Sequence, residues 1–571
     1  MLYLYFCFAV DFFVNLRFIS LQLIPLRMIY LKKVTFFVSI IITFYACVNN
    51  QVDNPVFQQA IENGKAANEG FYRSLKFVNG WLAEADSVSG LIPRNLYKGK
   101  DFWNAQDAAA DNYPFMVLTS SILDQKLYEG KMLDMLKAEI MLTSRVGNLP
   151  DSYSFSKQAF LNDEIAMGPI LFGASEYMKD GLMPLTEWLG NTPWLERMKG
   201  ILDDFQKETE VITALDGNYF GKSAVVEING ELLQVLSRMY WISGEQKYLD
   251  WAIKIGDYYL LNDENLPSNM EYLRLRDHGC EIISGLSELY LTLHFVDTLK
   301  KMEYSKPMHQ MLDRILEIGR NEHGLFYNGV NGITGEVIDG RIADNFGYTF
   351  NAYYCVYLLD GNDAYRDAVL KGLGNLHYYK NYVWEGDPKQ APGSADGYAD
   401  AIEGTINLYN REPMASVKDW IDSEIKVMFS IQKDDGIVEG WHGDGNFART
   451  AIMYSLWKTK GLTINSWRED VVFGAVEKDD KLWVSMQSEN DWNGRLIFDK
   501  PRYKENLNMP IDYPRINQFP EWFTVQKDAK YKVRDLSNGK TSSYSGKDLQ
   551  NGLEIGLKSG EIRKLVVEMI D

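Results

Sequence analysis

The stretch ELLQVLSRMYWISGEQKYLDWAIKIGDYYL, residues 231–260, decides the fold class. Its first half repeats apolar residues at spacings of three and four, which predicts an α-helix with one buried face: Leu232, Leu233, Leu236, Met239 and Tyr240. The short connection Ser243-Gly244-Glu245 separates this helix from a second one that begins near residue 246. Two amphipathic helices joined by so few residues predict a helical hairpin.

The same pattern recurs between about residues 54 and 460. Roughly seven pairs of helices are predicted to begin near residues 54, 105, 130, 164, 186, 226, 246, 279, 305, 345, 364, 398, 415 and 446. Long loops precede the even-numbered helices, at positions represented by Trp103, Phe160, Tyr219, His278, Asp344, Tyr398 and His442. Open α-solenoids have shorter periods of ~34 to ~47 residues. We therefore predict a mainly α fold, an α/α toroid whose long loops surround one cleft.

After Gly461 the pattern changes to short alternating or β-branched segments, such as 470–476 and 482–486. Turn signals separate them, including Asp479-Asp480 and Asn538-Gly539. We expect a toroidal domain at residues 47–461 and a β-sandwich domain at residues 462–571. Such a build is frequent in polysaccharide-degrading proteins, although a fold alone names no reaction.

The amino terminus has the layout of a secretory leader. Lys32-Lys33 precedes an apolar run, residues 34–46, that stops at Cys47. We expect residues 1–46 to be removed, Met28 to be the true start, and Cys47 to carry lipid; a plain cleaved signal or a lone buried cysteine are the alternatives. The protein is then secreted across the inner membrane and held at a membrane only by this anchor, in the periplasm or on the cell surface.

Composition narrows the function classes. The 571 residues are 46% hydrophobic and 24% charged, which excludes disorder and a multi-span membrane protein. The formal charge of −19, without any basic run, argues against nucleic acid as a partner. Aromatic residues make up 13%, which suits sugar binding. The four cysteines show neither a disulfide framework nor metal-ligand spacing, so no metal and no cofactor are expected.

Two of the six histidines, His278 and His442, lie in loops dense in polar residues, each just before an even-numbered helix. A histidine near its ordinary pKa is a natural general acid or base, although each could simply hydrogen-bond a neighbouring loop. The other four are expected to be structural: His294, His309, His323 and His377.

The remaining candidates lie in the same loops. Tyr348 is expected one turn into a helix, where it could move a proton or be an ordinary core aromatic. Asp400 and Glu403 share a helix face, as a hydrolytic pair would or as a solvated surface would. The candidates for substrate binding are Trp103, Asn104, Asp111, Arg276, Arg341, Asp344, Asn345, Tyr398, Trp441 and Arg449. Loop cations would form a patch that selects an anionic glycan, namely Arg94, Lys98, Lys100, Arg274, Arg276, Arg341 and Arg449.

The motifs Asp111-Asn112-Tyr113-Pro114-Phe115 and Trp441-His442-Gly443-Asp444-Gly445, with the leader, the toroid and the β-rich tail, support a family resemblance. The chain resembles uronic-acid-degrading proteins of marine Bacteroidetes, in particular the broad-specificity ulvan lyases of polysaccharide lyase family 40. Their activity has also been described as dehydration of uronate-ended oligosaccharides. Glucuronidases of the same toroid class are similar in layout.

This resemblance implies a carbon–oxygen lyase that performs β-elimination on the uronates of ulvan or a related sulfated, anionic glycan. Removal of the C5 proton beside a carboxylate requires a group that neutralises that carboxylate. Arg276 and Arg341 are assigned this part. His278 and Tyr348 are the base and the acid in either order, with His442 as an alternative base.

Two other functions stay open at this point. In a uronide hydrolase the acid and the base would come from Asp111, Asp344, Asp400 or Glu403, and the histidines would only bind. A glycan-capturing lipoprotein would perform no chemistry, although the hairpin period argues against that class.

Overall fold

The structure is a computed structural model that describes residues 54–215, 221–277, 279–385 and 393–570. The leader, Met28, Cys47, Tyr219 and His278 lie outside the described residues, so the predictions made for them stay predictions. Within the described part, no helix has both the length and the apolar character needed to span a bilayer. Residues 59–571 form one unit, to which the following description applies.

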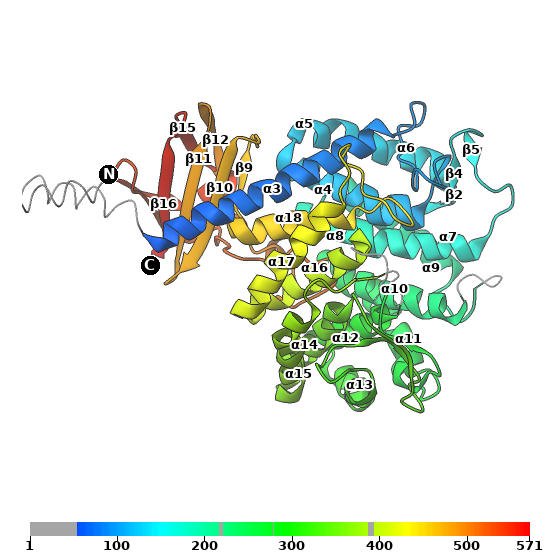
Figure 1. The fold of residues 1–571 in the computed structure, drawn as a ribbon. Coiled ribbons are helices and arrows are strands. Elements are labelled where there is room, and N and C mark those ends of the chain that lie inside the picture. Colours follow the sequence, from blue (N-terminus) through cyan, green and yellow to red (C-terminus); the bar gives the residue numbers. More distant parts are fainter. Residues whose placement is uncertain (1–53, 216–220, 278, 386–392, 571) are drawn as a thin grey trace, which may run out of the picture. The chain divides into compact units, whose positions relative to one another are not determined.

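The helices alternate between an inner and an outer layer of a closed ring. Consecutive inner helices pack against one another, and α18 packs against α4, which closes the ring. Figure 1 shows α10, α12, α14 and α16 following one another around it. The inner layer consists of η1 (Ala105–Asn112) with α4 (Tyr113–Leu123), α7 (Met167–Glu176) with η3 (Tyr177–Leu182) and α8 (Met183–Leu189), α10 (Gly221–Ser243), α12 (Cys280–Val296), α14 (Phe346–Asp360), α16 (Ala395–Arg411) and α18 (Asn446–Thr459).

Each inner helix except α18 leads into an outer helix, and α3 covers α18, where Ser455 Oγ donates to Ala67 O at 2.9 Å. The outer layer consists of α3 (Pro55–Ala83), α5 (Gln125–Leu127) with η2 (Tyr128–Met132) and α6 (Leu133–Thr143), α9 (Pro193–Glu208), α11 (Gln246–Leu260), α13 (Thr298–Ile318), α15 (Asp363–Gly374) and α17 (Ala415–Ile431). The inner helices correspond to the even-numbered helices of the sequence prediction. The predicted α/α toroid of helical hairpins is confirmed.

Glycines let the inner helices approach closely at two places. A Cβ at Gly347 of α14 would lie 2.5 Å from the Cα of Gly404 of α16. A Cβ at Gly230 of α10 would lie 2.4 Å from the backbone at Glu281 and Ile282 of α12. Because real Cβ atoms do not come this close, these residues fix the spacing of the inner layer.

The long loops before the inner helices pair with one another as small sheets. One sheet joins the loops before η1 and α7, and another joins those before α12 and α14. The pairing requires these loops to lie at the same end of the ring, as predicted. Their elements are β1 (Phe102–Trp103), β2 (Ser144–Val146), β3 (Leu149–Pro150), β4 (Tyr153–Ser154), β5 (Ala159–Phe160), η4 (Pro267–Asn269), β6 (Leu273–Arg274), β7 (Tyr327–Val330), β8 (Val337–Ile342) and η5 (Leu376–Tyr379).

The carboxy-terminal region contains two antiparallel sheets, as the sequence predicted. The order β10-β11-β16-β13-β14 makes up the larger sheet and β15-β12-β9 the smaller. Both sheets bury apolar residues, such as Val484 and Ile555, as the two sheets of a β-sandwich do. The elements are β9 (Thr463–Asn465), β10 (Val471–Lys478), β11 (Lys481–Ser488), β12 (Trp492–Ile497), β13 (Lys530–Asp535), β14 (Lys540–Ser545), α20 (Gly546–Asn551), β15 (Leu553–Leu557) and β16 (Ile562–Ile570).

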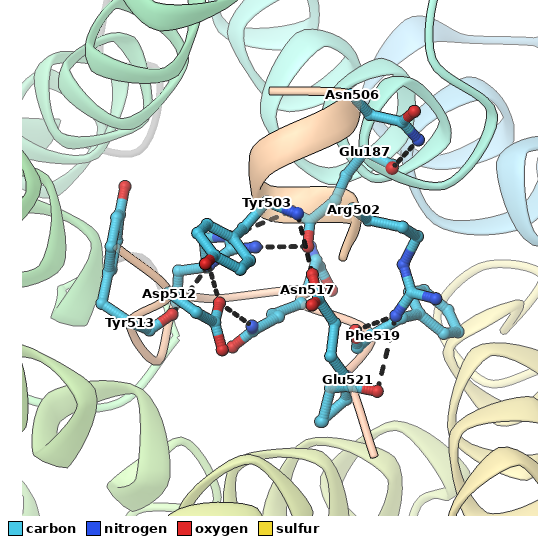
Figure 2. Close-up of polar contacts among 12 residues, drawn as sticks. Glu187, Arg502, Tyr503, Asn506, Asp512, Tyr513, Asn517, Phe519 and Glu521 are labelled. Carbon is cyan, nitrogen blue, oxygen red and sulfur yellow. Dashed lines mark hydrogen bonds and ion pairs between the residues drawn. The ribbon is translucent and has the colours of Figure 1, made fainter. Parts of the chain in front are cut away.

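Between β12 and β13 the chain leaves the sandwich and enters the ring. This segment, residues 499–525, is called the strap here. Its two ends meet because Val525 N donates to Asp499 O at 2.9 Å. It contains the short helix α19 (Arg502–Glu505), and Figure 2 shows it surrounded by helices of the ring. The sequence did not predict that part of the β region would pack inside the toroid.

The strap contacts the inner helices far from the loop end. Arg515 is fully buried and forms a bidentate ion pair with Glu187, at 2.6 and 3.0 Å. Tyr513 OH donates to Glu288 Oε2 at 2.8 Å, and Arg411 of α16 donates to Asp512 at 2.7 Å. The strap therefore closes the end of the ring that is opposite to the long loops.

Candidate active site

A cavity of about 520 Å³ lies where the inner helices begin. Of the described residues that line it, thirteen are Asp or Glu, and three are Lys179, His442 and Arg449. The acidic ones are Asp107, Asp111, Glu176, Asp180, Glu227, Glu231, Asp277, Glu281, Glu385, Asp396, Asp400, Glu439 and Asp444. Trp441 at the edge of the cavity is 69% exposed, with the guanidinium of Arg94 4.8 Å from its ring centroid.

Ten of these carboxyl groups come in pairs four residues apart, each pair within or just before an inner helix. The pairs are Asp107 and Asp111, Glu176 and Asp180, Glu227 and Glu231, Asp277 and Glu281, and Asp396 and Asp400. A spacing of four places both members on one helix face. Like charges at this spacing destabilise a helix, so their recurrence around one cavity favours a binding or catalytic role.

Asp400 is held by three donors from three elements. Its carboxylate accepts from Arg449 Nη2 at 2.7 Å, from Tyr348 OH at 2.9 Å and from Asn345 Nδ2 at 2.6 Å. Burial raises the pKa of Asp400, and Arg449 opposes that shift. Hydrogen bonds donated to a carboxylate favour its ionised form, so this arrangement holds an oriented carboxylate at the cavity wall.

Glu403 lies below Asp400 on the same helix and is fully buried. Its Oε2 lies 2.5 Å from Tyr348 OH and 2.9 Å from Arg449 Nη2, so Glu403 and Asp400 share the single hydroxyl proton of Tyr348. Burial raises the pKa of Glu403 to about 7, with Arg449 opposing. Burial likewise raises the pKa of Tyr348 well above its ordinary value, so Tyr348 is a donor rather than a tyrosinate.

Asp111 and His442 face each other across the cavity wall, with Oδ2 3.7 Å from Nε2. The Nδ1–H of His442 donates to Gly443 O at 3.0 Å, which leaves Nε2 directed at Asp111. Burial raises the pKa of Asp111 to about 8, although the charge of His442 opposes this. Burial disfavours the charged form of His442, but the carboxylates of Asp111, Asp107 and Asp444 outweigh it and raise the pKa of His442 to about 9. At neutral pH Asp111 can therefore give up a proton, whereas His442 cannot accept one.

Two groups of side chains could hold a cation among the described residues. They are Asp107 with Asp111 and His442, and Glu176 with Glu227 and Glu231, each group with ligand atoms within 4.8 Å of one another. The Asp107 carboxylate already accepts from Arg94 Nε at 2.6 Å. Burial and the neighbouring carboxylates raise the pKa of Glu176 and of Glu231 well above the usual range, so shared protons can also stabilise the second group.

The structure brings seven of the candidate residues to the cavity: Asp111, Asn345, Tyr348, Asp400, Trp441, His442 and Arg449. Trp103 and Tyr398 are instead core residues, at 2% and 1% exposure, so neither offers a free ring face. Asn104 is buried and caps η1 by accepting from Ala108 N. Asp344 is buried beside Arg276, whose charge opposes the burial that raises the pKa of Asp344 to about 8.

Of the seven cations predicted to form a patch, Arg449 alone belongs to the described lining of the cavity. Arg341 has a side chain 48% exposed and is bound to Asp339 on β8, outside the cavity lining. Arg276 pairs with Glu385 at 3.1 Å and lies 3.8 Å from Asp277. Arg341 and Arg276 are thus both paired with carboxylates, and the described lining has an excess of acidic groups.

Sequence reasoning missed the acidic residues of the second and third inner helices and one residue of the strap. The four-residue spacing of Glu227 and Glu231, and of Glu176 and Asp180, was a signal that could have found them. Lys179 forms ion pairs with Asp180 at 2.7 Å and with Glu281 at 2.9 Å, which joins η3 to α12. Asn517 of the strap had no sequence signal, since its position depends on the course of the whole strap.

No protein-family model and no curated protein sequence matches the chain. Among solved structures, it is similar to a family 76 glycoside hydrolase (mannosidase) of Bacteroides thetaiotaomicron VPI-5482, with 14% identity, a TM-score of 0.39, and 68% of this chain and 99% of that one covered. An inactive α-1,6-mannanase of the same family from Salegentibacter sp. HEL1_6, in complex with α-1,6-mannotetrose, gives 12% identity, a TM-score of 0.38, and coverage of 68% and 98%. A polysaccharide lyase has 14% identity with the chain and a TM-score of 0.34, with 49% of this chain and 87% of that one covered. These likenesses are too distant to assign a reaction or a substrate.

Proposed function

We propose that this protein is a glycan-processing enzyme that hydrolyses a glycosidic bond in the acidic cavity. The observation that carries the proposal is that two carboxyl groups, Asp111 and Asp400, lie on the wall of one cavity, the first facing His442 and the second held by Arg449, Tyr348 and Asn345. Glycoside hydrolysis needs these two groups, one to protonate the leaving oxygen and one to activate water or attack the sugar.

Asp111 is assigned as the general acid. With its pKa raised to about 8, it keeps its proton at neutral pH and can donate it to the glycosidic oxygen. The charge of His442 stabilises the Asp111 carboxylate once the proton has left. His442 is therefore assigned a supporting role, and not the role of alternative general base that the sequence suggested.

Asp400 is assigned as the base or nucleophile. Arg449, Tyr348 and Asn345 fix both of its oxygens, so little reorganisation is needed when the oxocarbenium-like state forms. A negatively charged cavity also stabilises positive charge that develops on the sugar ring.

The charge of the cavity indicates the class of substrate. Thirteen acidic residues against three basic ones, among the described lining, disfavour a polyanion, and Lys179 and Arg449 are already paired with carboxylates. Carboxyl and carboxylate oxygens bind sugar hydroxyl groups well. We infer that the cavity accepts a neutral sugar unit, with Trp441 as a stacking surface at its edge.

β-Elimination on a uronate is the competing proposal, because Tyr348 lies one turn into α14 at the cavity wall, where the lyase mechanism requires it. Three observations weigh against it. His442 is held protonated, the pKa of Tyr348 is raised, and Arg276 and Arg341 are occupied by carboxylates.

The two proposals are separated by incubating the protein with neutral oligosaccharides and, in parallel, with ulvan. Hydrolysis predicts new reducing ends from a neutral oligosaccharide and no gain in ultraviolet absorbance. Unsaturated products from ulvan would support elimination instead. Asp111→Asn and Asp400→Asn should each abolish hydrolysis, and the exposed Asp134→Asn on α6 is the matched control.

A further inference from the structure

The strap places one side chain, Asn517, against residues that line the cavity. Asn517 is 1% exposed and has a φ of 60°, in the left-handed region that asparagine tolerates better than most residues. This conformation directs its backbone N–H and its side-chain amide to different partners. Figure 2 shows Asn517 with the other strap residues, enclosed by the ring.

The polar groups of Asn517 bind residues that lie beside the proposed catalytic carboxyl groups. The backbone N–H donates to Glu403 Oε1 at 2.7 Å, and Nδ2 donates to Asp180 Oδ1 at 2.7 Å. Oδ1 accepts from Arg449 Nη1 at 2.8 Å. Three inner elements, η3, α16 and α18, therefore meet at one strap residue.

Arg449 transmits this contact to Asp400. The side chain of Arg449 is 2% exposed. Its Nη2 donates to Asp400, and its Nη1 donates to Asn517 and Asn446. A planar guanidinium cannot move one nitrogen without moving the other. The position of Asn517 thus sets the position of the donor that orients Asp400.

We propose that the strap is part of the catalytic centre and that Asn517 is a positioning residue for Arg449 and Asp400. The inference rests on the proposed function for the role of Asp400, but the contacts themselves do not depend on it. The neighbouring Ile516 packs with Tyr348 and Cys280, so the strap also supports the second donor to Asp400. The β region thereby supports, from behind the lining, a cavity whose walls come from the toroid.

The test compares Asn517→Gly with Asn506→Ala in the full-length protein. Glycine keeps the left-handed backbone and the N–H bond to Glu403 but removes both side-chain contacts. Asn506 also joins the strap to the ring, through Nδ2 to Glu187 O at 2.8 Å, without touching the cavity. It therefore serves as the control for a purely structural role.

The assay uses an oligosaccharide that the wild type cleaves. On this substrate, Asn517→Gly should have a kcat lower by about tenfold or more and a KM changed by less than about threefold. The acid limb of its kcat profile should move to higher pH, because a displaced Arg449 no longer lowers the pKa of Asp400 as strongly. Asn506→Ala should keep the wild-type profile. Wild-type kcat and an unmoved acid limb in Asn517→Gly would overturn the inference.

A second readout is independent of activity. A weaker hold on Arg449 raises the pKa of Glu403 and Asp400 further in the folded state, so stability should fall more steeply as pH rises from about 5 to 8. The melting temperature of Asn517→Gly should show this steeper fall, and Asn506→Ala should parallel the wild type. If Asn517→Gly also runs parallel, the inference is wrong even if no glycoside is ever cleaved. If the wild type cleaves no oligosaccharide but the melting temperature of Asn517→Gly falls more steeply with pH, the proposed function fails and the inference about Asn517 stands.

Discussion

Oδ2 of Asp111 lies 3.7 Å from Nε2 of His442, and both side chains line the same acidic cavity. Two titratable groups at this distance control each other's protonation. The charge of His442 limits how far burial raises the pKa of Asp111, and the carboxylates keep His442 protonated. This relationship gives Asp111 the properties of a general acid near neutral pH.

Replacement of Asp111 by asparagine should lower kcat by about 10²- to 10⁴-fold, the usual contribution of a general acid. Folding should be retained, because the amide keeps the shape of a side chain that is already neutral in the folded protein at neutral pH. The effect is measured as the initial rate on an oligosaccharide that the wild type cleaves. Asp134→Asn, an exposed change on an outer helix, should leave the rate unchanged.

The pH profile of kcat/KM should be bell-shaped. The alkaline limb should lie near pH 8, where Asp111 loses the proton that it must donate. His442→Gln removes a positive charge that lowers the pKa of Asp111, so this limb should move to higher pH. A limb that stays in place or moves to lower pH in His442→Gln would contradict the assignment of the acid.

The protein should be more stable at pH 5.5 than at pH 8. Asp111, Glu403 and Asp444 have folded-state pKa values of about 8, 7 and 6, all above the values of an unfolded chain. The folded state therefore binds more protons than the unfolded state in this window, and stability falls as pH rises. Melting temperatures across the range test the sign, and Asp111→Asn should flatten the slope.

Loss of one partner of the buried Arg515–Glu187 pair should destabilise the protein by about 3–5 kcal/mol, because the remaining charge is left buried and unpaired. Arg515→Met tests this by urea unfolding. The double variant Arg515→Met with Glu187→Leu should recover part of the loss. An effect no larger than that of an exposed pair, such as Lys137 with Asp134, would show that the strap is not firmly held.

Gly347→Ala should cost about 1–3 kcal/mol of stability, as overpacking of a core does. The new Cβ would meet the backbone at Gly404, which cannot move like a flexible side chain. Gly374→Ala in α15 is the control, because a Cβ at Gly374 would meet nothing within 4 Å, and its stability should be close to that of the wild type. Gly361 is less suitable because its φ of 67° disfavours alanine.

The toroid could be predicted from the sequence because its signals are local. Apolar spacing in stretches such as 231–260 gives the helices, and the alternation of short and long connections gives the hairpins. The strap could not be predicted, because residues 499–525 have the composition of a loop and their place inside the ring depends on contacts with helices hundreds of residues away.

The site was predicted only in part, for the same physical reason. Loop position identified Asp111, Tyr348 and His442, which do reach the cavity. It also suggested Trp103 and Arg341, but whether a loop side chain points to the core, the cavity or a surface carboxylate depends on tertiary packing. The acidic character of the cavity emerges only when five inner helices are brought together.

The central claim, hydrolysis in an acidic cavity, is tested most directly by mass analysis of the products formed from a defined oligosaccharide in water enriched in heavy oxygen. Hydrolysis predicts that the two products together gain one water and that heavy oxygen is incorporated at the cleaved bond, with Asp111→Asn inactive. Products that together gain no water, carry a C4–C5 double bond and form only from a uronate-containing substrate would contradict the account and support elimination.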